Sequence, residues 1–120
     1  EIEKVVKKGD YTLGQKVDEC EKNFAKRTGS KLAISVGNGT DAIFLSLKAL
    51  NIGNGDEVIT TPYTFIATIG SIVAADAKPV FVDINPTTLN MDVDDIKKNI
   101  NRFITCSTAY FYLYWISCYH

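Results

Sequence analysis

The sequence has few of the residues that build metal sites and disulfide frameworks. Its 120 residues include only three cysteines and one histidine. The cysteines, Cys20, Cys106 and Cys118, are odd in number and lack the spacing of a zinc site. His120 is the last residue and has no neighbouring metal ligand in the sequence. We therefore predict no metal centre and a reducing, cytoplasmic setting.

An excess of charge of one sign is also missing. The chain has 13 Lys+Arg against 14 Asp+Glu, a net charge of -1. Without a basic surplus to neutralise phosphates along a duplex, nucleic-acid binding is not expected. The aromatic-rich stretch 103–119 is too short and too polar to predict a membrane span, although a C-terminal anchor stays open beside a buried strand with a ragged end. The length allows one small domain.

Apolar spacing predicts helices that alternate with short strands. Helical spacing occurs over residues 15–28, from the loop 37–41 to about residue 50, over 64–75, and after a predicted N-cap at Asp92. The predicted strands are Leu32–Val36, which we expect to be buried, Glu57–Thr61 and Val80–Asp83. Such alternation indicates βαβ units, and therefore an α/β fold with a mainly parallel sheet and flanking helices.

The loop Gly37-Asn38-Gly39-Thr40-Asp41 leads from a predicted strand directly into a helix. Glycines let a ligand approach the backbone, and free N–H groups of Thr40 and Asp41 at the positive end of the helix would bind phosphate. A plain turn in which Thr40 or Asp41 caps the helix is equally compatible. A dinucleotide site is not, because the next strand ends in Thr60 and Thr61 without the required acidic residue.

The segment Thr61-Pro62-Tyr63-Thr64-Phe65 places two aromatic residues after the neighbouring strand. A flat ring beside a phosphate-binding helix suits a phosphorylated aromatic cofactor, which stacks on the ring while its phosphate is held. From spacing alone, the alternative that Phe65 joins the apolar face of the helix is somewhat favoured. Asp83, at the end of the third predicted strand, is interpreted as part of a turn.

Five motifs in one order resemble the start of a known enzyme family, the DegT/DnrJ/EryC1/StrS aminotransferases. The resemblance covers residues 9–104 without a gap and is carried by Tyr11-Thr12-Leu13-Gly14, Val36-Gly37-Asn38-Gly39-Thr40-Asp41-Ala42, Gly55-Asp56-Glu57-Val58-Ile59, Thr61-Pro62-Tyr63-Thr64-Phe65-Ile66-Ala67-Thr68 and Lys78-Pro79-Val80-Phe81-Val82-Asp83-Ile84. It implies the aspartate-aminotransferase-like fold (PLP fold type I). It also implies a pyridoxal-phosphate enzyme that moves an amino group from glutamate to a nucleotide-linked keto sugar, as a homodimer without a membrane or nucleic-acid partner.

The resemblance assigns roles to four residues. Gly39, Thr40 and Asp41 match the stretch whose backbone N–H groups, with the threonine hydroxyl, hold the cofactor phosphate. Phe65 matches the aromatic residue that stacks on the pyridine ring, which overturns the core-packing preference. The loop Tyr11–Gly14 corresponds to one near the active site, with no contact assigned.

The resemblance also shows what is missing. The Schiff-base Lys and the pyridine-pairing Asp of the family fall beyond the end of this chain, so no catalytic residue is assigned. We expect residues 1–104 to be part of the large domain, about the first third of such an enzyme with its sheet truncated. Residues 105–120 are expected to be an aberrant aromatic-rich tail. The alternative is a non-catalytic remnant or small α/β binding module without activity of its own.

Overall fold

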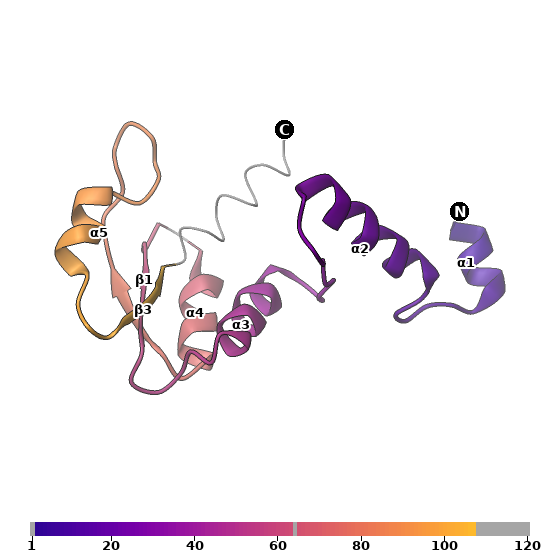
Figure 1. Cartoon of the computed structure of the whole chain (residues 1–120), viewed down its shortest axis with the longest axis horizontal. Coiled ribbons are helices and arrows are strands. Elements are labelled where there is room, and N and C mark those ends of the chain that lie inside the picture. The colour runs from indigo at the N-terminus through magenta and orange to yellow at the C-terminus, as the bar shows by residue number, and fades with distance from the viewer. Residues whose placement is uncertain (1, 64, 108–120) are drawn as a thin grey trace. The chain divides into compact units, whose positions relative to one another are not determined.

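The computed structural model describes residues 2–63 and 65–107 and divides the chain into two compact units, residues 1–37 and 38–120 (Figure 1). Each unit is described by itself. The candidate phosphate loop, from Gly39 on, and Phe65 belong to the same unit, 38–120. The site can therefore be built from that unit alone.

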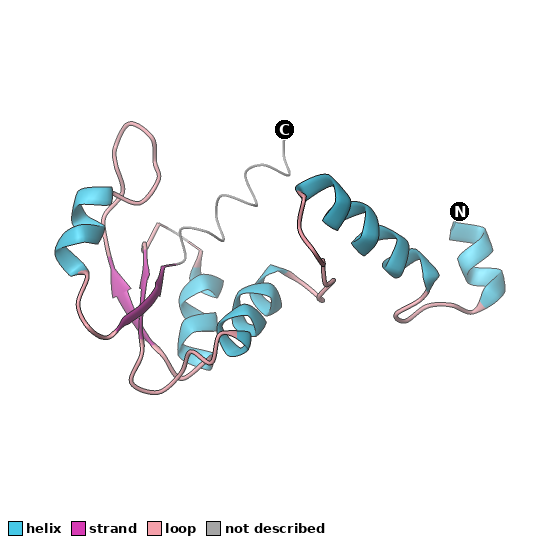
Figure 2. Cartoon of the chain, in the orientation of Figure 1, coloured by secondary structure: helices cyan, strands magenta, loops and turns pink. Residues whose placement is uncertain are grey.

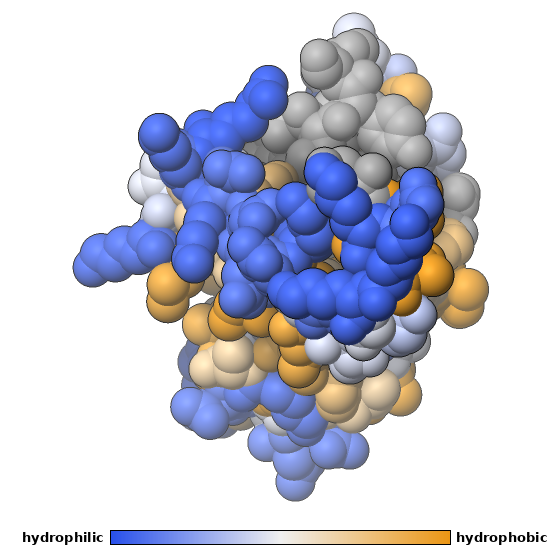
Figure 3. All heavy atoms as spheres, turned by 90° about the vertical axis from the view of Figure 1, so that its right-hand side faces the viewer, coloured by the Kyte–Doolittle hydropathy of each residue, from blue (hydrophilic) through white to orange (hydrophobic). Residues whose placement is uncertain are grey.

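The N-terminal unit holds two helices, α1 (Ile2–Lys8) and α2 (Gln15–Thr28). Helix α2 has the predicted bounds and ends where Gly29 takes the left-handed conformation, at φ 70°, and donates its N–H to the carbonyl of Ala25. At its start, the carboxylate of Asp10 accepts the N–H of Gln15 at 3.2 Å. Charged residues make up at least half of the residues of both helices, and Figure 3 shows hydrophilic and hydrophobic residues together on the surface it presents.

The prediction of a buried strand over Leu32–Val36 is wrong. These residues pair with no strand in the part of the chain that the structure describes, and the side chains of Leu32 and Ile34 are 79% and 81% exposed. The N–H of Ser35 donates to the carboxylate of Glu21 rather than to a neighbouring strand. The apolar run has the composition of a strand, but a strand also needs a second strand to pair with.

The second unit alternates helices and strands, as predicted. Its elements are α3 (Gly39–Ala49), β1 (Glu57–Thr60), α4 (Ile66–Ala74), β2 (Lys78–Phe81), α5 (Val93–Asn99) and β3 (Ile104–Ser107). The three strands form a parallel sheet in the order β2-β1-β3 (Figure 2). Pro79 lies within β2 rather than before it, and the edge position of this strand tolerates the missing N–H.

Helices α3 and α4 lie beside the sheet, and α5 lies on the other side of the strands in Figure 1. The core that joins α3 and α4 to the sheet consists of apolar side chains at most 7% exposed: Leu47, Ile52, Val58, Ile72, Ala75 and Ala77. This core fixes both helices against β1. The expected α5 cap is confirmed, because the Asp92 carboxylate accepts the N–H groups of Asp94 and Asp95, each at 2.9 Å.

The expected aberrant tail falls mostly outside the described residues. Its first residues form part of β3, which pairs with β1. Residues 108–120, with Cys118 and His120, lie outside the described part, so the division at residue 104 stays a prediction. None of the described helices has the length and hydropathy needed to cross a bilayer.

Candidate functional site

Two contacts fix the direction of α3 relative to α4. Near the start of α3, the hydroxyl of Ser71 donates to the carbonyl of Thr40 at 3.1 Å. At the end of α3, Lys48 Nζ donates to the carbonyl of Ala75 at 2.8 Å. The earlier residue of α3, Thr40, meets the earlier residue of α4, Ser71, and the later Lys48 meets the later Ala75. The two helices therefore run side by side in the same direction. Their N-termini therefore point the same way.

The N-terminus of α4 lies at the carboxyl end of the sheet. Strand β1 ends at Thr60, and α4 begins only six residues later at Ile66. Ser71, which contacts Thr40 at the start of α3, lies about one and a half turns after the first residue of α4. The first turn of α3 and the start of α4 thus form one end of the helical layer, where ligands of open α/β sheets bind.

The first turn of α3 is capped by Asn38. Its side-chain oxygen accepts the N–H of Asp41 at 2.9 Å, and its amide nitrogen donates to the Asp41 carboxylate at 3.0 Å. The expectation that Asp41 presents a free N–H is therefore wrong, and neither Thr40 nor Asp41 is the capping residue. The sequence signal for this cap, an Asn before a helix, was available and was missed.

The two residues between the cap and Asp41 keep donors for a ligand. Gly39 and Thr40 are exposed, and within the described part of the chain their backbone N–H groups have no hydrogen-bond partner. They are the first two residues of α3, where the positive end of the helix dipole lies. This donor set fits an anion such as a phosphate group.

Phe65 lies at the same end of the helical layer and could stack on an aromatic ring attached to that phosphate. It is the residue before α4, with extended backbone at φ -91° and ψ 111°, and its side chain is 58% exposed. The alternative that Phe65 belongs to the helix's buried face is wrong, since Ile72, Ser71 and Thr68 fill that face. The role of Phe65 in stacking on a ring stays a prediction, as do the phosphate roles of residues 39–41.

Asp83 serves the turn, as predicted. Its carboxylate accepts the N–H of Ile84 at 2.7 Å, its N–H donates to the Asp95 carboxylate at 2.9 Å, and its carbonyl accepts the N–H of Asp92. These bonds fasten β2 to the start of α5. Within residues 2–63 and 65–107, no group of three His, Cys, Asp or Glu residues could hold a metal ion.

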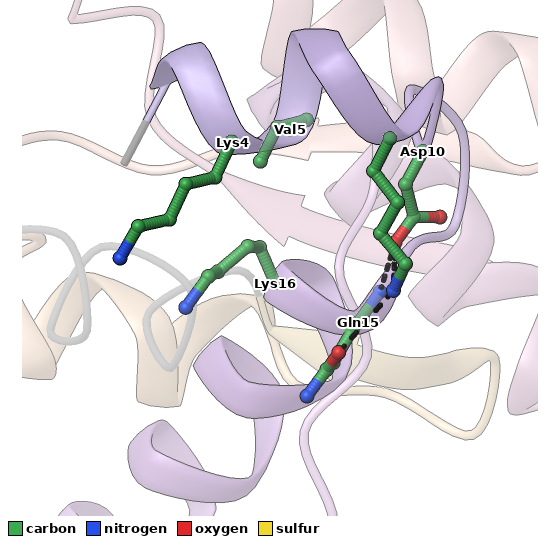
Figure 4. Close-up of a pocket in the computed structure, with 6 residues that line it drawn as sticks. Lys4, Val5, Asp10, Gln15 and Lys16 are labelled. Atoms are coloured by element: carbon green, nitrogen blue, oxygen red, sulfur yellow. Dashed lines mark hydrogen bonds and ion pairs between the residues drawn. The ribbon is translucent and has the colours of Figure 1, made fainter.

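A separate surface hollow of about 250 Å³ lies in the N-terminal unit (Figure 4). Lysines give it a basic character, but Lys8 pairs with Asp10 at 3.6 Å and Lys16 with Glu19 at 2.8 Å. These ion pairs are on the surface and neutralise much of the local charge. No sequence motif points to this hollow, and we assign it no role.

Comparison with known proteins assigns the family. The model of the DegT/DnrJ/EryC1/StrS aminotransferase family matches residues 1–106. The chain is 48% identical over 101 residues to the pleiotropic regulatory protein of Geobacillus stearothermophilus, covering 84% of this chain and 27% of that protein. It is 46% identical over 91 residues to the UDP-2-acetamido-2-deoxy-3-oxo-D-glucuronate aminotransferase of Pseudomonas aeruginosa, covering 76% and 25%.

A solved structure agrees. NtdA from Bacillus subtilis, with bound cofactor PMP, is 33% identical to this chain and superposes with a TM-score of 0.84, over 88% of this chain and 24% of NtdA. The chain belongs to the DegT/DnrJ/EryC1/StrS aminotransferase family. It has the fold of the N-terminal part of such an enzyme and spans about a quarter of the length of the curated relatives it matches.

Proposed function

We propose that this chain contributes the phosphate-binding and ring-stacking part of a pyridoxal-phosphate-dependent sugar aminotransferase. The observation that carries the proposal is the shared end of α3 and α4: the N–H groups of Gly39 and Thr40, which have no partner among residues 2–63 and 65–107, start α3, and the exposed Phe65 precedes α4. Membership of the family and the PMP bound by NtdA support the choice of cofactor.

Each residue has a separate task in this proposal. The N–H groups of Gly39 and Thr40 donate to the phosphate, and the helix dipole adds a favourable field for its negative charge. The Thr40 hydroxyl adds a further donor. The N–H of Asp41 joins them only if the Asn38 side chain releases it, because that bond is made in the present structure. Phe65 stacks on one face of the pyridine ring and excludes water from it.

The described residues position the cofactor and do not perform the proton transfers. Pyridoxal phosphate, when bound, supplies the electron sink that lets an amino group pass between an amino acid and a keto group. Three lysines of this unit are engaged elsewhere: Lys48 bonds the Ala75 carbonyl at the end of α4, Lys78 pairs with Glu57 at 2.7 Å, and Lys97 pairs with Asp94 at 3.0 Å. The covalent attachment and the proton transfers are therefore proposed to belong to residues outside this chain.

The proposed substrates are glutamate and a nucleotide-linked keto sugar, used in polysaccharide or deoxyamino-sugar biosynthesis. The name of the Pseudomonas aeruginosa relative, a UDP-sugar aminotransferase, supports the sugar. We also propose a homodimer, supported by exposed apolar side chains such as Ile66, at 73%, and Val73, at 57%. A cytoplasmic location is supported by Cys20, an exposed free thiol of the kind that reducing compartments preserve.

A chimera tests the proposal. The 91 matching residues of the Pseudomonas aeruginosa aminotransferase are replaced by those of this chain, and glutamate-dependent amination of the UDP-3-keto sugar is measured. We expect the chimera to bind the cofactor and turn over. The matched control is the same chimera with Thr40→Val and Phe65→Ala, which should fold and lose cofactor. A folded chimera that does not retain pyridoxal phosphate contradicts the proposal.

A further inference from the structure

Ser71 is the polar side chain that joins the two helices of the candidate site. It is 1% exposed and sits in α4, and its hydroxyl lies 3.1 Å from the carbonyl of Thr40 and 2.8 Å from the carbonyl of Ala67. The second contact is the ordinary bond of a helical serine to the residue four positions earlier. The first reaches across to the first turn of α3, so the single proton of the Ser71 hydroxyl is shared between two carbonyl oxygens.

The carbonyl that Ser71 reaches belongs to the proposed phosphate-binding residue. Thr40 offers both a backbone N–H and a side-chain hydroxyl to the phosphate in the proposal above. The Thr40 carbonyl shares its peptide plane with the N–H of Asp41 and is joined through the Thr40 Cα to the N–H and hydroxyl of Thr40. A bond to this carbonyl therefore restrains the backbone angles of Thr40, which set where its donors point. A buried hydroxyl at the Thr40 carbonyl adds a second restraint to the first turn, which Asn38 caps at Asp41 and whose first N–H groups have no partner within the helix.

The same contact sets the distance between the two halves of the site. Phe65 precedes α4, Thr40 lies in the first turn of α3, and Ser71 bonds the Thr40 carbonyl near the start of α3. At the far end, Lys48 bonds the Ala75 carbonyl at 2.8 Å. With α3 fastened to α4 at two levels, the first turn of α3 keeps its position relative to α4, the helix that Phe65 precedes.

We propose that Ser71 is a positioning residue for phosphate binding: through the Thr40 carbonyl it holds the donors of the first turn of α3 ready for the anion. This inference rests on the proposed function. It requires no contact between Ser71 and the cofactor. Ser71→Ala removes only the hydroxyl and leaves the packing of the site almost unchanged, so the fold should survive.

Ser46 provides a matched control within the same pair of helices. Its hydroxyl bonds the carbonyl of Ala42 at 2.7 Å, the same four-residue back-bond that Ser71 makes to Ala67. That bond stays within α3. Ser46→Ala therefore removes an equivalent hydroxyl from the helical pair and leaves the bond between α3 and α4 intact.

The experiment compares the wild-type 120-residue chain, Ser71→Ala and Ser46→Ala by NMR, with and without inorganic phosphate. Without phosphate, the amide of Phe44, which bonds the Thr40 carbonyl within the helix, should exchange with solvent several-fold faster in Ser71→Ala only. With phosphate, the Gly39 and Thr40 amides should shift, and Ser71→Ala should weaken the apparent affinity about threefold to tenfold, the value of one ordinary hydrogen bond.

Three results would overturn the inference. Equal exchange at Phe44 in the two variants would mean that Ser71 does not hold the first turn. Equal phosphate affinity of Ser71→Ala and wild type, with wild-type shifts present, would refute the positioning role while the proposed function stands. Absence of any wild-type shift at Gly39 and Thr40 would refute the proposed phosphate site, and the inference with it.

Discussion

Lys78 Nζ lies 2.7 Å from Oε1 of Glu57, and the two residues stand opposite each other where β2 pairs with β1. The hydrogen bond from Lys78, with a second from Asn101 at 2.9 Å to the other carboxylate oxygen, holds the pKa of Glu57 below its usual value of 4.5. This carboxylate thus links β1 to β2 and to the segment before β3.

The sign of the pH dependence follows from that pKa. A carboxyl whose pKa is lower in the folded than in the unfolded state stabilises the fold above about pH 4.5, and this contribution is lost as the pH falls through the folded value. We expect Glu57→Gln to be less stable than wild type at neutral pH and to lose less stability on acidification. Urea unfolding at a series of pH values measures this. Parallel curves for the two proteins would contradict it.

Removal of the Thr40 hydroxyl should weaken binding of the phosphate. The loss of one donor to a doubly charged group costs about 1.5–3 kcal/mol, the value of a charge-assisted bond. The measurement is an NMR titration of Thr40→Val with pyridoxamine phosphate, a ligand without the aldehyde that would react with lysines. The control is Thr87→Val, a threonine whose backbone N–H is held by Asn85 in a distant turn. Unchanged affinity in Thr40→Val would remove Thr40 from the site.

Phe65→Ala should loosen the cofactor more than it destabilises the chain. The ring is 58% exposed, so its loss takes away little core burial, while a stacking contact is lost from the bound ligand. Pyridoxamine phosphate affinity and melting temperature are measured together. Phe24→Ala, in the other unit and 45% exposed, is the matched loss of a ring. A variant that loses only stability would return Phe65 to a packing role.

The cap of α3 should separate stability from binding. Asn38→Ala removes the acceptor of the Asp41 N–H and should cost about 1 kcal/mol of stability, the usual value of an N-cap. Because it frees a donor at the site, it should not weaken phosphate binding. Asp92→Ala removes the cap of α5 at similar cost, away from the site, and serves as the comparison. Weaker phosphate binding in Asn38→Ala alone would show that Asn38 itself contacts the anion.

The 120-residue chain alone should not transaminate. Lys48 and Lys78 are engaged with the Ala75 carbonyl and with Glu57, and the remaining lysines lie outside the segments that follow β1 and β2. Borohydride treatment with pyridoxal phosphate should label several lysines weakly, and glutamate should give no turnover. Stoichiometric labelling of one lysine with turnover would contradict the proposal that covalent attachment lies elsewhere.

Local signals predicted most of the fold. The spacing of α2 and the glycine that ends it gave its bounds, because both are properties of neighbouring residues. The prediction of a strand over Leu32–Val36 was wrong because strand pairing depends on a segment far away in the sequence, which apolar composition does not reveal. At the site, the glycine loop and Phe65 were visible as motifs. Ser71 was not, since its bond to Thr40 spans 31 residues and only the packing of α4 on α3 creates it.

The most direct test of the account is an NMR titration of the wild-type chain with pyridoxamine phosphate, with pyridoxamine as the matched ligand that lacks the phosphate. We predict shifts of the Gly39 and Thr40 amides with pyridoxamine phosphate only, together with an intermolecular nuclear Overhauser effect between the pyridine protons and the ring of Phe65. Equal shifts with both ligands, or shifts confined to residues 1–37, would contradict the claim that the shared end of α3 and α4 holds the cofactor.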